Sequence, residues 1–445
     1  MPKGYMVLTR LVDFFKGPFV TQQERIKFVL LSGIFFCILG VYWLMRPLKD
    51  GVFFTVVGKA HQPNAKIISL FVVAAVVIIY SRLVDRFSRH TLLYFFAIFY
   101  AVTTAVFAYF LLDPQIGMAN TQADPGRLIG WTWYFFVESF GSIMVSLFWS
   151  FVSDTTSLEQ ASRGYATIAL GGQLGGLLGP FFGQYSDTNG ALYMIVGGLF
   201  SLLVVVSLYM KCVHEPEDMH KVDKKNPPLE GMPKSGFLEG LRLLLTRPYL
   251  LGIFTFIVIY EILITMIDYR FKVLASEVYA GEALVTYLFK YAIYANLVAV
   301  VALFFGIGAL GRRLGVMKTL IMFPFLIVGA FLMLFMHPVL SVAFGIMVLC
   351  KGINFALMQP AKEQLYLPTS KESRYKAKAW IDMFGLRMSK GLGSSINNFS
   401  ELLGVEFFMW MSVLLSVGLA GLWFLIVLFV GRIHAKAVKE DRMIC

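Results

Sequence analysis

Two charged residues lie inside long apolar stretches, where a charge is costly. Glu138 occurs within the sequence FFVESFG, and Lys351 occurs within LCKG. A carboxylate or an ammonium group at bilayer depth is stable only if it faces a polar cavity or a counter-ion, so such residues mark transport pathways. We predict that Glu138 and Lys351 belong to a transport site and pair with each other. The alternative is a packing carboxylate, paired with a neighbouring lysine, that has no role in transport.

Further charged residues lie at the ends of the first and the seventh apolar segments, which occupy equivalent positions in the two halves of the chain. They are Arg46 and Lys49 in the first segment, and Asp268, Arg270 and Lys272 in the seventh. Basic residues at helix ends ordinarily anchor a span at the membrane interface, but that bias belongs to the cytoplasmic side. On the outer side, cations at the mouth of a cavity would attract a polyanion, and phosphate groups suit both Arg and Lys. The pattern predicts a site for a phosphorylated anion.

Three more cations complete the candidate site. Lys362 lies at the inner end of the tenth apolar segment, and Arg387 and Lys390 lie one turn apart in the eleventh. Lys362 has an acidic neighbour, so an interfacial ion pair would explain it equally well. The candidate substrate-binding residues are Arg46, Lys49, Glu138, Asp268, Arg270, Lys272, Lys351, Lys362, Arg387 and Lys390.

The sequence offers no pattern for catalysis, for a metal or for a cofactor. There is no Walker A motif, no paired nucleophile and base, and no C-x-x-C among the four cysteines. The run from Gly171 to Gly179 contains overlapping G-x-x-x-G patterns, which predict close helix packing rather than nucleotide binding. We expect neither enzymatic activity nor a bound cofactor.

The elements that position these charges are membrane-spanning helices. Hydrophobic residues make up 58% of the 445 residues and charged residues only 15%, a balance that a soluble domain could not cover with polar surface. We predict an all-α integral membrane protein of about twelve helices. The predicted spans are 28–48, 67–81, 91–112, 130–152, 165–184, 191–210, 249–267, 289–310, 319–336, 339–361, 379–398 and 407–431.

The net charge of +12 is explained by membrane topology rather than by nucleic-acid binding. Most of the 39 Lys and Arg residues fall in alternate loops and in the two terminal tails. The positive-inside rule then places both termini in the cytoplasm. The first 27 residues are basic and amphipathic, and no cleavable signal peptide is expected before the first span.

The two halves of the chain resemble each other. LVDRFSR follows the second span and LGRRLG the eighth, while TSLE follows the fourth span and TSKE the tenth. Such matches in order predict a parallel repeat, with a six-helix half at 1–211, a polar cytoplasmic linker at 212–247 and a second six-helix half at 248–445. The LVDRFSR loop also resembles the cytoplasmic signature of the major facilitator superfamily.

Several motifs together resemble those of the ADP,ATP carrier family of plastids and obligate intracellular bacteria. MRPLKD is similar to the first-span motif LRDTKD, VESFGS to AELWGS, PAKEQLYLP to PCKExxYIP, and AKAWID extends the last block. A tyrosine, an acidic residue and a lysine of the seventh span correspond to Tyr260, Asp268 and Lys272. The resemblance implies exchange of ATP for ADP, or uptake of other nucleotides, with roles in transport for Lys49, Glu138, Asp268 and Lys362.

The chain departs from the family motifs at four positions, which widens the range of expected substrates. Pro47 and Gln359 stand where acidic residues are usual, Asn354 stands in place of a lysine, and Asp268 is shorter than the usual glutamate. The expected substrates therefore include other nucleotides, NAD or another phosphorylated solute. The alternatives are a facilitator of another organic anion with proton coupling through Glu138, and a membrane receptor that has kept the fold but lost transport.

The expected partners are a nucleotide or other small anion and the lipid bilayer, with no nucleic acid. We expect a monomer in the bacterial inner membrane or an equivalent organelle membrane.

The topology is testable with single cysteines in a variant that lacks the four native ones. Cysteines replacing Lys225 and Gln122 are expected on opposite sides, because the basic loops face the cytoplasm. A membrane-impermeant thiol reagent should label the Gln122→Cys variant in intact cells and spare Lys225→Cys. The reverse pattern would overturn the predicted orientation.

Overall fold

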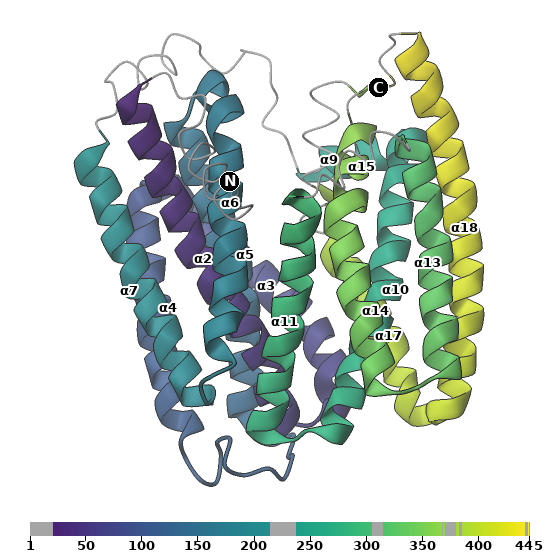
Figure 1. Cartoon of the computed structure of the whole chain (residues 1–445), viewed down its shortest axis with the longest axis horizontal. Coiled ribbons are helices and arrows are strands. Elements are labelled where there is room, and N and C mark those ends of the chain that lie inside the picture. Colours follow the sequence, from purple (N-terminus) through teal and green to yellow (C-terminus); the bar gives the residue numbers. More distant parts are fainter. Residues whose placement is uncertain are drawn as a thin grey trace, which may run out of the picture. The chain divides into compact units, whose positions relative to one another are not determined.

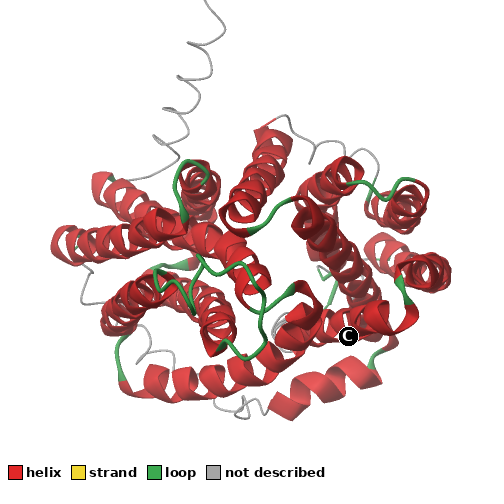
Figure 2. Ribbon diagram, turned by 90° about the horizontal axis from the view of Figure 1, so that it is seen from below, coloured by secondary structure: helices red, strands yellow, loops and turns green. Residues whose placement is uncertain are grey.

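The computed structural model describes residues 21–213, 237–304, 315–366, 368–369, 380–381, 385–440 and 444, and within these ranges the regular elements are all helices. Figures 1 and 2 show them as long helices joined by short loops. The first half contains α2 (Gln22–Val56), η1 (Lys59–His61), α3 (Gln62–Arg86), α4 (Arg89–Leu111), α5 (Leu128–Thr155), α6 (Leu158–Gly183) and α7 (Thr188–Cys212).

The second half contains one additional short helix before the long ones. Its elements are α9 (Phe237–Thr246), α10 (Pro248–Val278), α11 (Gly281–Phe304), α13 (Val316–Met336), α14 (Leu340–Ile353), η2 (Asn354–Met358), α15 (Gln359–Leu365), α17 (Leu386–Leu403) and α18 (Val405–Lys439). The segment η2 is a π-helix, which the sequence analysis did not predict. Residues 214–236 of the predicted linker and the repeat motifs at 310–314 and 370–379 lie outside the described residues.

The prediction of an all-α membrane protein is confirmed. In the described part of the chain, nine helices are long and apolar enough to cross a membrane, and α14 is apolar but shorter. Each predicted span overlaps a described helix, but α6 is rich in glycine and α17 carries many polar residues, so neither meets that standard. A count of twelve spans therefore stays a prediction. Helices such as α2 and α10 extend well beyond their predicted ends, because a helix can continue past the hydrocarbon layer.

The described helices form two compact units. The first comprises described residues within 1–59, 71–227 and 279–296, and the second comprises those within 60–70, 228–278 and 297–445. The helices α3 and α11 are each divided between the two units. The sequence boundaries of the predicted halves do not mark this division, and they stay a prediction.

Helix α2 is the central helix of the first unit, where it packs against α5, α6 and α7. Its contact with α6 is unusually close because glycines face it. A β-carbon on Gly175 would lie 2.2 Å from the carbonyl oxygen of Phe36, and one on Gly179 would lie 2.4 Å from that of Gly40. The close helix packing predicted from the G-x-x-x-G pattern is confirmed.

In the second unit α10 holds the corresponding central position, packed against α14, α17 and α18. Both central helices carry predicted site residues. Large apolar side chains such as Phe71, Tyr109, Leu414 and Leu425 are exposed on outer faces. Exposed apolar surface of this kind is stable in lipid, so these faces suit the bilayer.

The close approach of α2 and α6 predicts a large penalty for a side chain at Gly175. Gly175→Val should destabilise the protein by about 1–3 kcal/mol or more, because its β-carbon would meet backbone that cannot move aside. The control is Gly197→Val on α7, where a β-carbon would meet nothing within 4 Å. Thermal unfolding in detergent, followed by size-exclusion chromatography, measures both. Equal losses for the two variants would contradict the packing argument.

Candidate functional site

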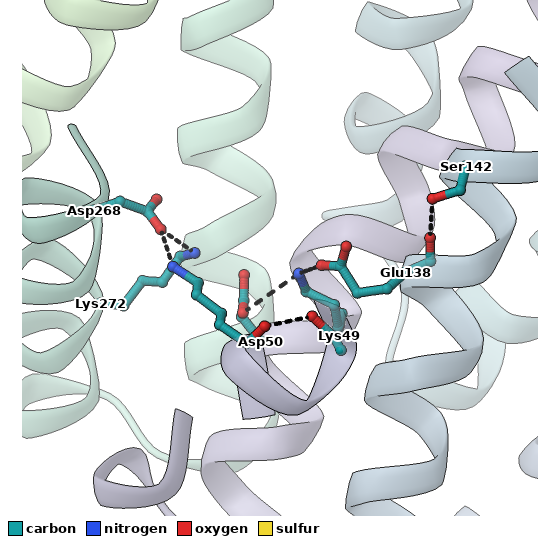
Figure 3. A network of polar contacts seen from close by, with 8 residues as sticks. Lys49, Asp50, Glu138, Ser142, Asp268 and Lys272 are labelled. Carbon is teal, nitrogen blue, oxygen red and sulfur yellow. Dashed lines mark hydrogen bonds and ion pairs between the residues drawn. The ribbon is translucent and has the colours of Figure 1, made fainter. Parts of the chain in front are cut away.

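A lysine–carboxylate cluster lies in the first unit, on α2 and α5. The Nζ atom of Lys49 donates a hydrogen bond to Oε1 of Glu138 at 2.5 Å, and it lies 4.0 Å from the Asp50 carboxylate (Figure 3). The side chain of Lys49 is 8% exposed and that of Asp50 is 4% exposed. Removing an ammonium group from water to this degree is costly, and the two carboxylates offset that cost.

The cluster also contains an aromatic ring and one more accessible carboxylate. Lys49 Nζ lies 4.5 Å from the centroid of the buried Tyr134 ring, a cation–π contact. Tyr134 and Glu138 are four residues apart, so both project from the same face of α5. The Glu138 side chain is 36% exposed, against 8% for Lys49. Glu138 is therefore the member of the pair that a solute can reach more easily.

Within the first unit, Glu138 has a lysine partner that the sequence did not single out. The sequence analysis paired Glu138 with Lys351, whereas its carboxylate is bonded to Lys49 within the same unit. Lys351 belongs to the second unit, so the predicted pair with Glu138 stays a prediction. Lys49 did not suggest itself as a partner of Glu138 because it was assigned to the outer end of the first helix. Since α2 continues to Val56, Lys49 lies two turns inside the helix instead.

A second lysine–carboxylate cluster lies in the second unit, around Asp268 of α10. Its Oδ2 atom accepts hydrogen bonds from Lys272 at 2.7 Å and from Lys66 of α3 at 3.2 Å (Figure 3 shows the first of these pairs labelled). All three side chains are at most 16% exposed. One carboxylate thus holds two ammonium groups in a largely buried position, so this cluster can attract an anion.

Lys66 is a member of this cluster that was not among the candidate residues. It counted as a loop cation because the second span was predicted to begin at 67. In the structure α3 begins at Gln62, so Lys66 lies one turn inside a helix. A lysine directly before an unusually short apolar run was the available signal, since the missing turn of helix had to come from the flanking residues.

Within the second unit, the positive charge of Lys351 lies near enough to act electrostatically on the Asp268 carboxylate. It is half-buried at the end of α14, three residues before the π-helix η2 begins. Single-turn π-helices within α-helices are frequent at functional sites. Gly352 lets this turn approach α11 closely, because a β-carbon there would lie 2.1 Å from the Val298 side chain. The sequence-predicted residues Asp268, Lys272 and Lys351 are thus brought together.

The remaining predicted residues lie in more varied surroundings. The guanidinium of Arg46 lies 5.2 Å from the centroid of the Trp43 ring. Arg270 lies two residues after Asp268 on α10, so the two side chains project from different faces of that helix. Lys362 is buried on α15, Arg387 is half-buried on α17, and Lys390 is exposed there. Exposure makes Lys390 the member of the predicted set least suited to a buried site.

Arg127 is a second residue whose role the sequence did not reveal. It precedes α5, is 8% exposed, and donates five hydrogen bonds of 2.7–3.2 Å to backbone carbonyls. Two of these carbonyls, those of Thr55 and Val56, end α2, and cations stabilise helix C-termini. Burial lowers the pKa of the Arg127 guanidinium, and the nearby Asp124 carboxylate opposes that shift. Arg127 fixes the end of the helix that carries Lys49.

Comparison with known proteins gives the family. The model of the Major Facilitator Superfamily matches residues 67–362. The chain belongs to this superfamily, and it is a multi-pass membrane protein.

Curated relatives narrow the resemblance further. ADP,ATP carrier protein 1 of Rickettsia typhi is 24% identical over 436 residues, which cover 85% of this chain and 86% of that protein. ADP,ATP carrier protein 1 of Chlamydia trachomatis is 25% identical, covering 85% and 82% of the two chains. The chloroplastic ADP,ATP carrier protein 2 of Arabidopsis thaliana is 24% identical, covering 84% and 68%. The resemblance predicted from the motifs is confirmed.

Solved structures agree with the fold. A bacterial homologue of the lysosomal transporter Spinster, in an inward-facing conformation, aligns with a TM-score of 0.62 at 13% identity and covers 94% of this chain and 99% of its own. A point mutant of the nucleoside transporter NupG aligns with a TM-score of 0.61 at 14% identity, covering 92% and 99%. At these identities the likeness concerns the fold alone.

The five carbonyl bonds of Arg127 predict that lysine cannot replace it. Arg127→Lys should lower stability by about 1.5–3 kcal/mol, because an ammonium group has three donors and cannot reach carbonyls spread around a planar guanidinium. Arg82→Lys, at an exposed site on α3, is the matched control. Thermal unfolding in detergent measures both variants. An Arg127→Lys protein as stable as the control would show that the loop contacts contribute nothing.

Proposed function

We propose that the protein is a nucleotide transporter that exchanges ATP for ADP, or takes up other nucleotides, by alternating access. The observation that carries the proposal is a buried lysine on each central helix beside a carboxylate. Lys49 of α2 is bonded to Glu138 of α5, and Lys272 of α10 is bonded to Asp268 of the same helix. The names of the ADP,ATP carrier relatives support the same substrate class. No enzymatic step is part of the proposal.

The chemistry of the clusters suits a substrate that carries several phosphate groups. Each lysine is already desolvated and aligned by a carboxylate, so little order is lost when a phosphate oxygen replaces that carboxylate. A phosphate group that enters the first cluster competes with Glu138 for Lys49. The displaced carboxylate is the more exposed partner, so it can turn toward water. Binding thereby breaks one ion pair and forms another.

The proposal extends to the membrane topology, the location and the partners of the protein. We infer two six-helix halves joined by a cytoplasmic linker, with both termini in the cytoplasm, and a location in a bacterial inner membrane. The support is the positive-inside distribution of Lys and Arg. We further propose a monomer whose partners are a nucleotide or similar small anion and the bilayer, and which does not bind nucleic acid.

The proposal is tested by uptake into proteoliposomes with a panel of labelled nucleotides, with and without internal counter-substrate. A nucleotide exchanger should accumulate label only when an unlabelled nucleotide is trapped inside. Uptake that needs a pH gradient and no internal nucleotide would instead favour a proton-coupled facilitator. No uptake of any nucleotide would refute the proposal.

The Lys49→Gln variant tests the role of the first cluster. It should weaken competition by ATP about tenfold to a hundredfold, the loss of one charge-assisted contact of about 1.5–3 kcal/mol, and leave competition by adenosine unchanged. Lys436→Gln, exposed near the end of α18, is the control and should match the wild type. Equal weakening of ATP and adenosine would make Lys49 a structural residue.

A further inference from the structure

Two aromatic rings on α2 lie against glycines in the first unit, and the proposed phosphate chemistry does not use them. The rings of Tyr42 and Trp43 are 6.1 Å apart and T-shaped, and both side chains are half-buried. A β-carbon on Gly141 of α5 would lie 2.5 Å from the Tyr42 ring, and one on Gly176 of α6 would lie 2.9 Å from the Trp43 ring. Glycine at both positions therefore makes room for a pair of flat rings.

A buried amide lies beside them. Asn296 of α11 is 4% exposed, and its Nδ2 donates to the carbonyl oxygen of Ala292 at 2.9 Å, which fixes the direction of the amide. Its Oδ1 lies 3.5 Å from the β-carbon position on Gly176, the same position that the Trp43 ring approaches. Among the residues that the structure describes, no donor is bonded to this oxygen. This oxygen is not among the fully buried atoms that lack a partner, so it can be reached by a ligand that brings a donor.

The aromatic pair is in line with the phosphate-binding residues. Tyr42, Arg46 and Lys49 are spaced by four and three residues, so they share one face of α2. At about 1.5 Å of rise per residue, the seven positions from Tyr42 to Lys49 span about 10 Å, a length that a nucleoside triphosphate can bridge. Arg46 lies between the two ends, with its guanidinium over the Trp43 ring.

We propose that Tyr42, Trp43 and Asn296 form the nucleobase subsite, and that the preferred base carries an exocyclic amino group, as adenine and cytosine do. The base replaces the Arg46 guanidinium over the Trp43 ring, and Arg46 turns toward the phosphates. The amino group donates to Asn296 Oδ1, in the manner of Asn side chains that recognise adenine. This inference rests on the proposed function and adds the part of the substrate that the lysines do not recognise.

The first test compares ligands with and without a base. Unlabelled ATP and inorganic triphosphate compete with labelled ATP for the purified protein. Trp43→Leu should lower the affinity for ATP about fivefold to a hundredfold, as expected for the loss of one base–aromatic stack. The affinity for inorganic triphosphate should change by less than about twofold. Trp410→Leu, on an exposed face of α18, should change neither. Equal weakening of both ligands by Trp43→Leu would overturn the subsite.

The second test concerns the amide and uses inosine triphosphate, in which an oxygen replaces the amino group of ATP. The wild type should prefer ATP about fivefold to tenfold, the range for one hydrogen bond. Asn296→Leu should remove that preference by lowering the affinity for ATP alone. An unchanged affinity for inorganic triphosphate would show that the site is still folded. Absence of the preference in the wild type, or its survival in Asn296→Leu, would overturn the assignment. If neither ATP nor triphosphate competes in the wild type, the proposed function itself fails.

Discussion

The cost of burying an ammonium group in a membrane protein governs the arrangement of both central helices. Lys49 and Lys272 are each no more than 8% exposed, and such cations are stable only beside carboxylates. Glu138 meets the first and Asp268 the second at hydrogen-bonding distance. The surrounding helices must hold these pairs to within a fraction of an ångström, so the rest of each unit can be understood as their support.

The support consists of close packing and of backbone contacts. Glycines of α6 let α2 approach so closely that a β-carbon would collide with its carbonyl groups. Arg127 holds the end of the same helix by five carbonyl bonds, two of them to the last turn beyond Lys49. In the second unit Lys66 adds a second cation to Asp268. A carboxylate that is shared between two lysines leaves positive charge available to an anion.

The sequence predicted the helical membrane fold and most of the residues in the two clusters, because burial of charge in apolar segments is visible in the chain itself. It did not predict the partner of Glu138, since pairing depends on which helix faces which and the end of α2 was placed two turns too early. Lys66 was assigned to a loop for a similar reason, whereas Arg127 does lie in a loop and only its contacts with the end of α2 were not foreseen. A span predicted from hydropathy stops where polar residues begin, whereas the helix or its capping contacts continue beyond that point.

In the proposed transport cycle, a phosphate group of the substrate replaces Glu138 at Lys49. Glu138→Gln removes the competing charge but leaves Lys49 beside Asp50 and Tyr134. Equilibrium binding of labelled ATP to purified protein and ATP/ADP exchange in proteoliposomes should therefore respond differently to this variant. Binding should be kept or strengthened, while exchange should slow by at least about tenfold, because the pair that re-forms in the empty carrier is lost. Near-normal exchange, or a loss of binding as large as the loss of exchange, would contradict the claim.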